Sequence, residues 1–434
     1  MTPDAIPDHL RLSLADVRGR LVLGYSGGLD SSVLLAGLCR AGLAQRVLAV
    51  HVHHGLHADA DQWLAHCQHQ AGLAGVDFIA ERVDVSGRGN LEQRARRARR
   101  QALLSHVGEQ DALLLAHHRQ DQAETLMLRL LRGAGARGLA AMAALQRWQG
   151  RDICRPLLGV ARVDLAQAAR VWQLQWIEDP ANSQLHFDRN FLRHRVMPVL
   201  AERWPEAGQS LQLTASVLAE QAQLLDELAE QDFSTCDGAG DSLALAGWQA
   251  LSPARRRNLI YGWCRRRGMR PPPADRVARI DTELVPAAED RQPEIRWSDG
   301  VLLRYRQRLW LVSPTAREPL SGRHLWHPQW QSRLGLGVIS VCLAREGELV
   351  FRASGRPLQV RGAEGGERIL LRGQHRQVSE LWRAAGIPPW QRQRLPLFFV
   401  DGELVAAAAI GVADGWSVAP GEAAFRITIE DSAL

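Results

Sequence analysis

From Leu21 to about Pro198, short apolar runs alternate with amphipathic stretches, and this alternation constrains the fold more than any other feature of the chain. The apolar runs predict strands at residues 21–25, 46–52, 76–83 and 111–117. Helical spacing predicts helices at residues 32–40, 60–72, 91–107 and 122–131. The pattern is typical of a doubly wound parallel α/β sheet with crossover helices. Because ligands bind beyond the carboxyl ends of such strands, the loops after Tyr25, Val52 and His117 are the places to look for chemistry.

The loop after the first strand has the composition of a phosphate-binding turn. It reads Ser26-Gly27-Gly28-Leu29-Asp30-Ser31 and leads directly into the first predicted helix. The two glycines let the backbone approach a phosphate, and a helix N-terminus offers unpaired N–H groups and the positive end of its dipole. Asp30 places a carboxylate where phosphates are expected, which makes sense if Mg²⁺ lies between them. The alternative is an ordinary βα turn in which Asp30 caps the helix.

The chain contains no lysine, so all 53 of its Lys+Arg residues are arginine. This excludes a Walker A loop, a pyridoxal phosphate Schiff base and a lysine that is itself adenylylated. A phosphate loop built from backbone amides and hydroxyls needs no lysine, so the absence of lysine does not exclude it. The net charge of +6 favours an anionic partner only weakly, and a solvated basic surface is the alternative.

A second polar segment, AHHRQDQAET at residues 116–125, follows the fourth predicted strand. His117, Asp121 and Glu124 are spaced by four and three residues, which predicts that they share one helical face at the carboxyl end of that strand. Two carboxylates and an imidazole suit Mg²⁺ binding and proton handling, so Asp121 joins Asp30 as a candidate metal ligand. An acidic first turn that caps the helix is the alternative.

Two further segments are rich in basic residues. The predicted helix at 91–107 brings Arg96, Arg99 and Arg100 near one another, either as a solvated face or as an anion-binding face. The segment HVHHGLH at 51–57 follows a strand and could bind a metal by composition. The six cysteines are scattered without a C-x-x-C pair, so neither zinc nor an iron–sulfur cluster is expected, and a reducing cytoplasm fits. No run of 18 apolar residues predicts a membrane span.

The loop at 26–31 matches S-G-G-x-D-S, and on this motif the chain resembles the N-type ATP pyrophosphatases, or PP-loop family. The resemblance implies that the loop binds the β and γ phosphates of ATP, which leave as pyrophosphate while a substrate is adenylated. The helix at 91–107 is similar to the family pattern E-x-x-A-R-x-x-R-Y, with Arg96 at the A-R position and Arg100 in place of the tyrosine. Residues 51–57 are similar to a segment that lines the nucleotide site, which we favour over a metal site.

The box at 116–125 resembles G-H-H-x-x-D-Q-x-E-T, which is shared by the lysidine synthetases and the tRNA thiolases of this family. Residues 155–158 (RPLL), 178–198 and 365–409 are similar to segments of the lysidine synthetases. The thiolases use cysteines for sulfur transfer or cluster binding, and this chain lacks the usual C-x-x-C. A thiolase is the runner-up, and an inactive RNA-binding module that kept the fold is a third option.

The lysidine synthetase resemblance implies a ligase that forms a carbon–nitrogen bond on tRNA. ATP, with Mg²⁺, would adenylate the wobble cytidine of the isoleucine tRNA with a CAU anticodon, and free L-lysine would displace AMP. Glu124 or His117 would act as base, and Arg96 would contact the nucleotide. The residues expected to contact tRNA or substrate are Arg99, Arg189, Asn190, Arg193, Arg372 and Arg376.

Composition shifts predict domains at 1–205, 206–318 and 319–434, the last a small α+β domain. The resemblance implies that the first domain is catalytic and that the middle and C-terminal domains bind tRNA. The middle segment includes a long helix over 211–231 and the PPP hinge at 271–273. The oligomeric state is left open by the sequence, with a homodimer as one option.

Overall fold

A computed structural model describes residues 1–55, 57–86, 91–288, 291, 293–314, 320, 323–326, 332–334, 337–343, 350–352, 356–418 and 423–429. The chain divides into two compact units, Met1–Leu224 and Leu225–Leu434, which are described separately below. The predicted division into domains 1–205, 206–318 and 319–434 stays a prediction.

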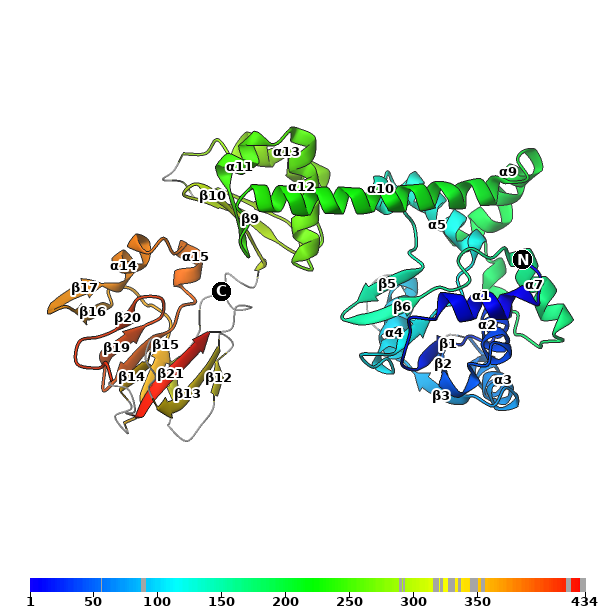
Figure 1. Ribbon diagram of the computed structural model, residues 1–434, viewed down its shortest axis with the longest axis horizontal. Helices are drawn as coiled ribbons and strands as arrows, with labels where there is room; N and C mark the ends of the chain where they lie inside the picture. Colours follow the sequence, from blue (N-terminus) through cyan, green and yellow to red (C-terminus); the bar gives the residue numbers. More distant parts are fainter. Residues whose placement is uncertain are drawn as a thin grey trace. The chain divides into compact units, whose positions relative to one another are not determined.

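The first unit is built on a six-stranded sheet with the strand order β3-β2-β1-β4-β6-β5 (Figure 1). The strands are β1 (Leu21–Gly24), β2 (Val47–His53), β3 (Asp77–Arg82), β4 (Ala112–Leu114), β5 (Leu145–Trp148) and β6 (Arg151–Cys154). Neighbouring strands are parallel except at the edge, where β5 runs antiparallel to β6. The carboxyl ends of β1, β2, β4 and β6 therefore meet at one edge of the sheet.

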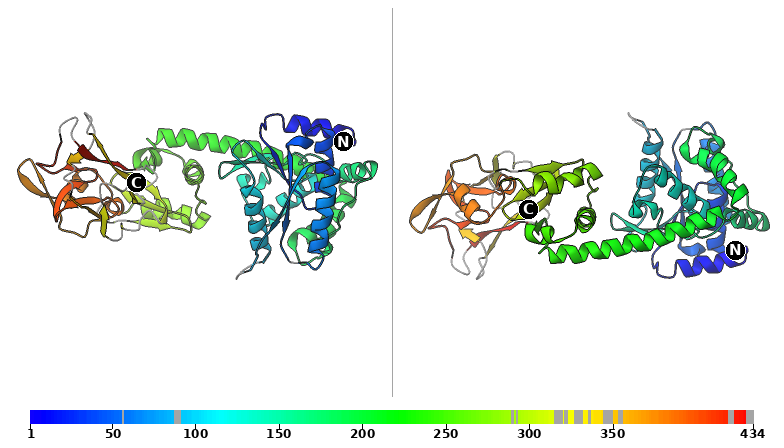
Figure 2. Two further views of the ribbon diagram at one scale, coloured as in Figure 1. Left: turned by 90° about the horizontal axis from the view of Figure 1, so that it is seen from below. Right: turned by 90° about the horizontal axis from the view of Figure 1, so that it is seen from above.

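Helices cover both faces of this sheet (Figures 1 and 2). They are α1 (Ala5–Ser13), α2 (Leu29–Arg40), α3 (Ala60–Leu73), α4 (Leu91–Ser105), α5 (Arg119–Leu131), α6 (Ala136–Leu139) and α7 (Arg162–Val171), with a 3₁₀ turn η1 (Ala44–Arg46). Leu21 and Leu23 of β1 face a core shared with α1, α2, α3 and α7, whereas Val22 faces a core shared with α4. Alternation along β1 thus buries both faces, as the two-sided apolar strand predicts.

The four predicted strands and four predicted helices are all present, and the fold class is confirmed. Two details differ. The fourth strand ends at Leu114, before the predicted His117, because the chain turns there into α5. The β5–β6 hairpin was not predicted; its two-residue turn, Gln149 and Gly150, has positive φ at both positions, which suits a tight hairpin.

The last part of the first unit is a helical segment with a local distortion. It comprises η2 (Pro180–Ser183), α8 (Asp188–Phe191), the π-helical turn η3 (Leu192–Val196) and α9 (Met197–Arg203). Pro198 cannot donate the backbone hydrogen bond that an α-helix requires of it, and its ring crowds the carbonyl four residues before, so the preceding turn widens. Such π turns are frequent at functional sites, and this one carries Arg193.

The long helix α10 (Ala207–Thr235) confirms the helix predicted over 211–231 and crosses the boundary between the two units. The second unit continues with β7 (Ser242–Ala244), α11 (Leu245–Ala250), α12 (Pro253–Arg266), α13 (Ala274–Arg279), the π turn η4 (Ile280–Leu284), β8 (Glu294–Arg296), β9 (Val301–Tyr305) and β10 (Arg308–Val312). Ser252 caps α12 and Pro253 occupies its first turn, a typical helix start. The four strands form one sheet in the order β7-β10-β9-β8.

The remainder of the second unit is rich in strands. They are β11 (Arg323–Trp326), β12 (Ser332–Leu334), β13 (Gly337–Leu343), β14 (Val350–Arg352), β15 (Leu358–Arg361), β16 (Arg368–Leu371), β17 (Gln374–Gln377), β18 (Leu397–Val400), β19 (Glu403–Ala407), β20 (Gly411–Val412) and β21 (Ala423–Ile429). Two short helices, α14 (Val378–Ala384) and α15 (Pro389–Arg392), lie among them. Trp390 of α15 contacts Tyr305 and Trp310, which joins this part to the β9–β10 hairpin.

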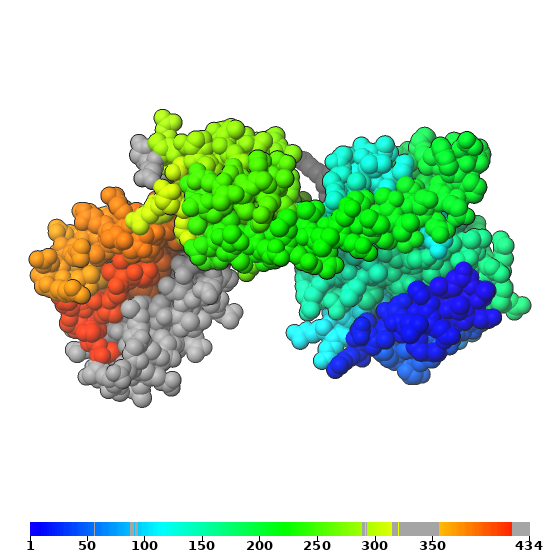
Figure 3. All heavy atoms as spheres, turned by 45° about the horizontal axis from the view of Figure 1, so that its top comes forward, coloured from blue at the N-terminus to red at the C-terminus, as the bar shows by residue number. Residues whose placement is uncertain are grey.

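The N-terminal segment, blue in Figure 3, lies at the surface of the first unit. Within the residues that the structure describes, no helix is long and apolar enough to cross a membrane.

Candidate active site

The turn between β1 and α2 is held open by contacts with the segment around Ile177. Gly27 has φ +75°, a conformation that favours glycine, and a Cβ atom there would lie 2.6 Å from Cδ1 of Ile177. The Ile177 N–H donates to the Gly27 carbonyl at 2.8 Å. The backbone of the loop is therefore fixed before any ligand arrives.

Hydroxyl groups and free amides gather at this turn. The Oγ atoms of Ser26 and Ser31 lie 3.1 Å apart, and the Gly28 N–H points to Ser26 Oγ at 3.4 Å. No side chain caps α2 at Gly28, so the N–H groups of its first turn have no intrahelical acceptor. A helix N-terminus of this kind attracts anions. The loop predicted from the sequence thus has the donors of a phosphate site.

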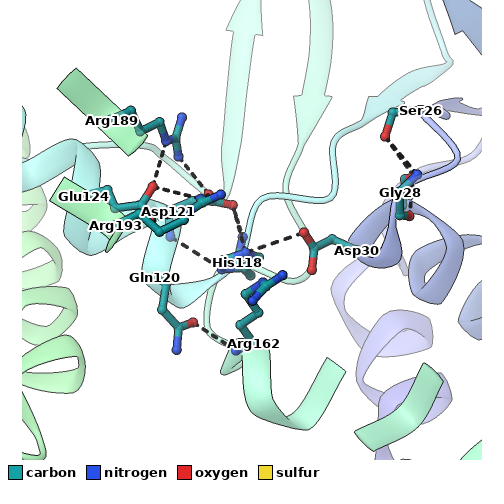
Figure 4. Close-up of polar contacts among 11 residues, drawn as sticks. Ser26, Gly28, Asp30, His118, Gln120, Asp121, Glu124, Arg162, Arg189 and Arg193 are labelled. Atoms are coloured by element: carbon teal, nitrogen blue, oxygen red, sulfur yellow. Dashed lines mark hydrogen bonds and ion pairs between the residues drawn. The ribbon is translucent and has the colours of Figure 1, made fainter. Parts of the chain in front are cut away.

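Asp30 and the start of α5 approach each other through His118 (Figure 4). The His118 N–H donates to Oδ2 of Asp121 at 3.0 Å, and the Asp121 N–H points to Nδ1 of His118 at 3.4 Å, which makes a capping box at the start of α5. The other ring nitrogen of His118, Nε2, faces the carboxylates of Asp30 and Asp121. That atom lies 3.6 Å from Oδ2 of Asp30 and 3.5 Å from Oδ2 of Asp121.

Two arginines from the distorted helical segment bind the carboxylates of α5. Arg189 donates through Nε to Glu124 at 2.7 Å and through a terminal nitrogen to Asp121 at 2.8 Å. Arg193 makes the same pair of contacts, with Nε to Glu124 at 2.7 Å and a terminal nitrogen to Asp121 at 3.0 Å. Glu124 is only 1% exposed, so this pairing neutralises a buried charge.

The electrostatics of the two aspartates differ. Burial raises the pKa of Asp30, although the positive charges of His118, Arg162 and Arg193 oppose the shift. Burial also raises the pKa of Asp121, but His118 and Arg189 outweigh it, so the pKa of Asp121 falls below its usual value. Oδ1 of Asp30 is buried and has no hydrogen-bond partner among the described residues. An orphaned carboxylate oxygen beside a phosphate loop is an available ligand for a cation or for a ligand hydroxyl.

His117 lies elsewhere than predicted. Helix α5 begins at Arg119, so His117 precedes the helix and does not share the face of Asp121 and Glu124. Burial lowers the pKa of His117 to about 3, helped by Arg155, Arg189 and Arg99, and its Nδ1 has no partner. His118, not His117, contacts Asp121, because His118 is the N-cap residue of α5. The sequence could have indicated this, because the residue before a helix often caps it.

The histidine segment after β2 lines the same edge of the sheet. His51 donates from Nδ1 to the Tyr25 carbonyl at 3.0 Å, which ties β2 to the phosphate loop. Burial lowers the pKa of His54 to about 4, and the charge of Arg99 on α4 adds to the shift. Arg96 is one of the charges that lower the pKa of Arg155. The structure therefore brings the arginines of α4 close to the predicted site.

The residues predicted to contact tRNA differ in their partners and in their exposure to solvent. Asn190 donates to the carbonyls of Ala181 and Gln184 at 2.9 and 3.0 Å, so its amide holds the η2 loop. Arg189 and Arg193 pair with the carboxylates of Asp121 and Glu124. Arg372 and Arg376 lie in the second unit, exposed on the β16–β17 hairpin.

One residue that the sequence did not single out also belongs to the site. Arg162 is the first residue of α7, and its backbone N–H donates to Oε1 of Gln120 at 2.9 Å. Its side chain lies near Asp30 in Figure 4, and its charge lowers the pKa of that carboxyl. No local sequence pattern marks Arg162, because the approach of α7 to the loop is a product of the fold.

The donor set at this site suits Mg²⁺ through Asp30. Among the described residues no group of three or more His, Cys, Asp or Glu side chains forms a metal cage. Mg²⁺ requires no such cage, because one or two carboxylates, water and substrate phosphates suffice. Asp30 keeps a free oxygen for this purpose, whereas both oxygens of Asp121 already have partners.

Three family models match this chain. A PP-loop domain model matches residues 8–200, a TilS substrate binding domain model matches residues 243–310, and a TilS substrate C-terminal domain model matches residues 358–429. A tRNA(Ile)-lysidine synthase from Alkalilimnicola ehrlichii is 40% identical over 99% of this chain and 97% of its own length. One from Serratia proteamaculans is 38% identical over 94% of each chain.

Among solved structures, a U34-tRNA thiolase from Methanococcus maripaludis aligns with a TM-score of 0.43 and 16% identity, over 50% of this chain and 79% of its own. The relatives that match along nearly the whole chain are lysidine synthases, so the thiolase is only a distant structural neighbour. With a PP-loop domain followed by both TilS domains, the chain belongs to the tRNA(Ile)-lysidine synthase family.

Proposed function

We propose that this protein uses ATP to attach free L-lysine to carbon 2 of the wobble cytidine, position 34, of the CAU-anticodon isoleucine tRNA. The cytidine is first adenylated with release of pyrophosphate, and lysine then displaces AMP to give lysidine. The lysidine pairs with A instead of G, so codon reading changes from AUG to AUA. The observation that carries the proposal is the chain of contacts from the phosphate loop through Asp30 and His118 to Asp121 and Glu124.

For the first step, the loop supports binding of the ATP phosphates. The unpaired N–H groups of α2 and the hydroxyls of Ser26 and Ser31 would hold the β and γ phosphates, with Leu29 contributing its backbone. These donors are fixed in advance, so they stabilise the charge that develops on pyrophosphate as it leaves. Mg²⁺ held by Asp30 would neutralise part of the same charge. Arg96 would contact the nucleotide from α4.

For the second step, the α5 carboxylates are the candidates to receive lysine. A free lysine amine has a pKa of about 10.4, so it arrives as an ammonium group and must lose a proton before it attacks. Glu124 is the better candidate for a base, because an imidazole with a pKa of about 3, as at His117, is a weak proton acceptor. An ammonium group at Asp121 and Glu124 would have to compete with Arg189 and Arg193.

For the tRNA, we propose phosphate contacts from exposed arginines in both units. Arg99 would contact a phosphate near the reacting base. Arg372 and Arg376 would bind phosphates of the tRNA body from the β16–β17 hairpin. Arg189, Asn190 and Arg193 would contact tRNA only if their present partners release them. We also propose a cytoplasmic location, and a homodimer stays a prediction.

The adenylation step can be tested alone. The protein is incubated with α-labelled ATP and a CAU isoleucine tRNA transcript, without lysine. We expect label in the tRNA, and its release as AMP when lysine is added. A transcript with uridine at the wobble position should stay unlabelled. Label that enters neither transcript, or both equally, would refute the proposed reaction.

A further inference from the structure

The β5–β6 hairpin forms one edge of the sheet of the first unit (Figure 1). This hairpin carries an exposed tryptophan, Trp148. Trp148 is the last residue of β5 and pairs with Arg151 across the two-residue turn. It is 40% exposed, and Leu145 at the other end of β5 is 63% exposed. Proteins usually blunt or cover an exposed apolar edge strand, so a conspicuous edge of this kind suggests an interaction surface.

An arginine already covers part of the Trp148 ring. The Arg100 guanidinium carbon lies 5.0 Å from the ring centroid, which is a cation–π contact. Arg151 donates to the Leu104 carbonyl at the end of α4, which fixes the hairpin against this helix. The indole is therefore held in place before any partner binds, and less side-chain entropy is lost on binding.

The surroundings of Trp148 are strongly positive. Helix α4 contains five arginines, and the hairpin adds Arg147 and Arg151. Within the described part of the chain, neither Arg99 nor Arg100 forms an ion pair with a carboxylate. The pKa of the buried Arg155 is lowered by burial and by the charges of Arg100 and Arg96, and its Nε has no hydrogen-bond partner in the described part of the chain. This excess of positive charge fits a polyanion and not an apolar protein surface.

Trp148 is also set apart from the candidate active site. Leu145 pairs with Cys154 at the carboxyl edge of the sheet, and Trp148 lies three residues further along β5. At about 3.3 Å per residue, the tryptophan is about 10 Å from that edge along the strand direction. A nucleotide that binds at Trp148 is therefore a different one from the nucleotide that reacts at the phosphate loop.

We propose that Trp148 and Arg100 form a platform on which an unpaired base of the RNA substrate stacks, while Arg147 and Arg151 meet the adjoining phosphates. Single-stranded RNA is bound in this way, through aromatic or guanidinium stacking combined with backbone charge. The inference rests on the proposed function, because the RNA is the tRNA substrate. It adds a second contact point for a base outside the reacting centre.

The test measures tRNA affinity by filter binding at two salt concentrations. Trp148→Ala should weaken binding by about 5- to 150-fold, since stacking on an aromatic ring is worth roughly 1–3 kcal/mol per base. Trp148→Phe should recover much of the loss. Arg100→Gln should also weaken binding, because it removes the guanidinium from the platform. Arg147→Gln should reduce the slope of log affinity against log salt by about 0.7–0.9, the value for one phosphate contact. ATP binding, and turnover at saturating tRNA, should be unchanged in all four variants.

Two matched controls separate the platform from general effects. Trp204 is 59% exposed on the same unit, and Trp204→Ala should leave affinity unchanged. Arg40 lies 4.9 Å over Trp172 on the opposite face of the sheet, and Arg40→Gln should do likewise. Wild-type affinity of Trp148→Ala, or an equal loss in Trp204→Ala, would overturn the platform. An absence of lysine transfer by the wild-type protein would instead count against the proposed function, so the two failures are distinguishable.

Discussion

A side chain at Gly27 should break the phosphate loop. A Cβ atom on this residue would lie 2.6 Å from Cδ1 of Ile177 and 2.7 Å from Sγ of Cys67, and the residue has φ +75°. The left-handed conformation alone costs a non-glycine residue about 1–2 kcal/mol. Overpacking of a buried contact costs about 1–3 kcal/mol more. We therefore expect Gly27→Ala to lower the free energy of unfolding by about 2–5 kcal/mol.

The chain supplies a matched control at Gly42. Its φ is +76°, and a Cβ atom there would meet nothing within 4 Å. Gly42→Ala should therefore show only the backbone cost, about 1–2 kcal/mol. The difference between the two variants isolates the steric conflict at the loop. Ile177→Val removes Cδ1, so it should recover part of the loss in Gly27→Ala and none in Gly42→Ala.

Urea denaturation, followed by tryptophan fluorescence and circular dichroism, measures these differences. ATP binding should weaken in Gly27→Ala and stay at the wild-type level in Gly42→Ala, because only the former displaces the loop. Equal destabilisation of the two variants would show that Ile177 and Cys67 do not confine the loop. Wild-type affinity for ATP in Gly27→Ala would refute the assignment of the loop to the phosphates.

Three further variants probe the polar groups of the site. Asp30→Asn should abolish tRNA-dependent AMP formation while the protein stays folded. Because burial raises the pKa of Asp30 in the folded state, the free energy of unfolding of the wild-type protein should fall as pH rises from the ordinary pKa of an aspartate to the raised pKa. Urea titrations should show that this pH-dependent loss is absent in the variant. Glu124→Gln leaves Arg189 and Arg193 without their buried carboxylate, so the free energy of unfolding from chemical denaturation should fall by an amount near the low end of about 3–5 kcal/mol. An unchanged denaturation midpoint would contradict the pairing. Burial lowers the pKa of His117 to about 3, so the stability that its neutral form contributes is lost as pH falls from 6.5 towards 3. In His117→Gln, the free energy of unfolding should depend less on pH over that range.

The sequence predicted what depends on local pattern. The alternation of strands and helices and the S-G-G-x-D-S turn are both encoded within short windows, so their positions agree with the structure to within a few residues. Asp30, Asp121 and Glu124 were predicted as site residues from the same local windows, and their roles stay predictions. The prediction that His117 shares a helical face with Asp121 and Glu124 was wrong, because α5 begins at Arg119, two residues after His117.

Long-range pairing could not be predicted. Arg189 and Arg193 are separated from their carboxylate partners by 65 to 72 residues, and only the fold brings them together. A sequence pattern cannot decide between a phosphate and a carboxylate as the partner of an arginine. The β5–β6 hairpin was missed because its strands are only four residues long and β5 is largely exposed, so neither strand shows a clear apolar alternation.

Transfer of labelled lysine into the tRNA tests the central proposal most directly. The wild-type protein and Asp30→Asn are incubated with ATP, labelled L-lysine and the CAU isoleucine tRNA, and the digested nucleosides are then separated. We expect ATP-dependent label in the wobble nucleoside with the wild-type protein and none with the variant. Tight tRNA binding without any label in that nucleoside would contradict the proposed function and would favour an RNA-binding module instead.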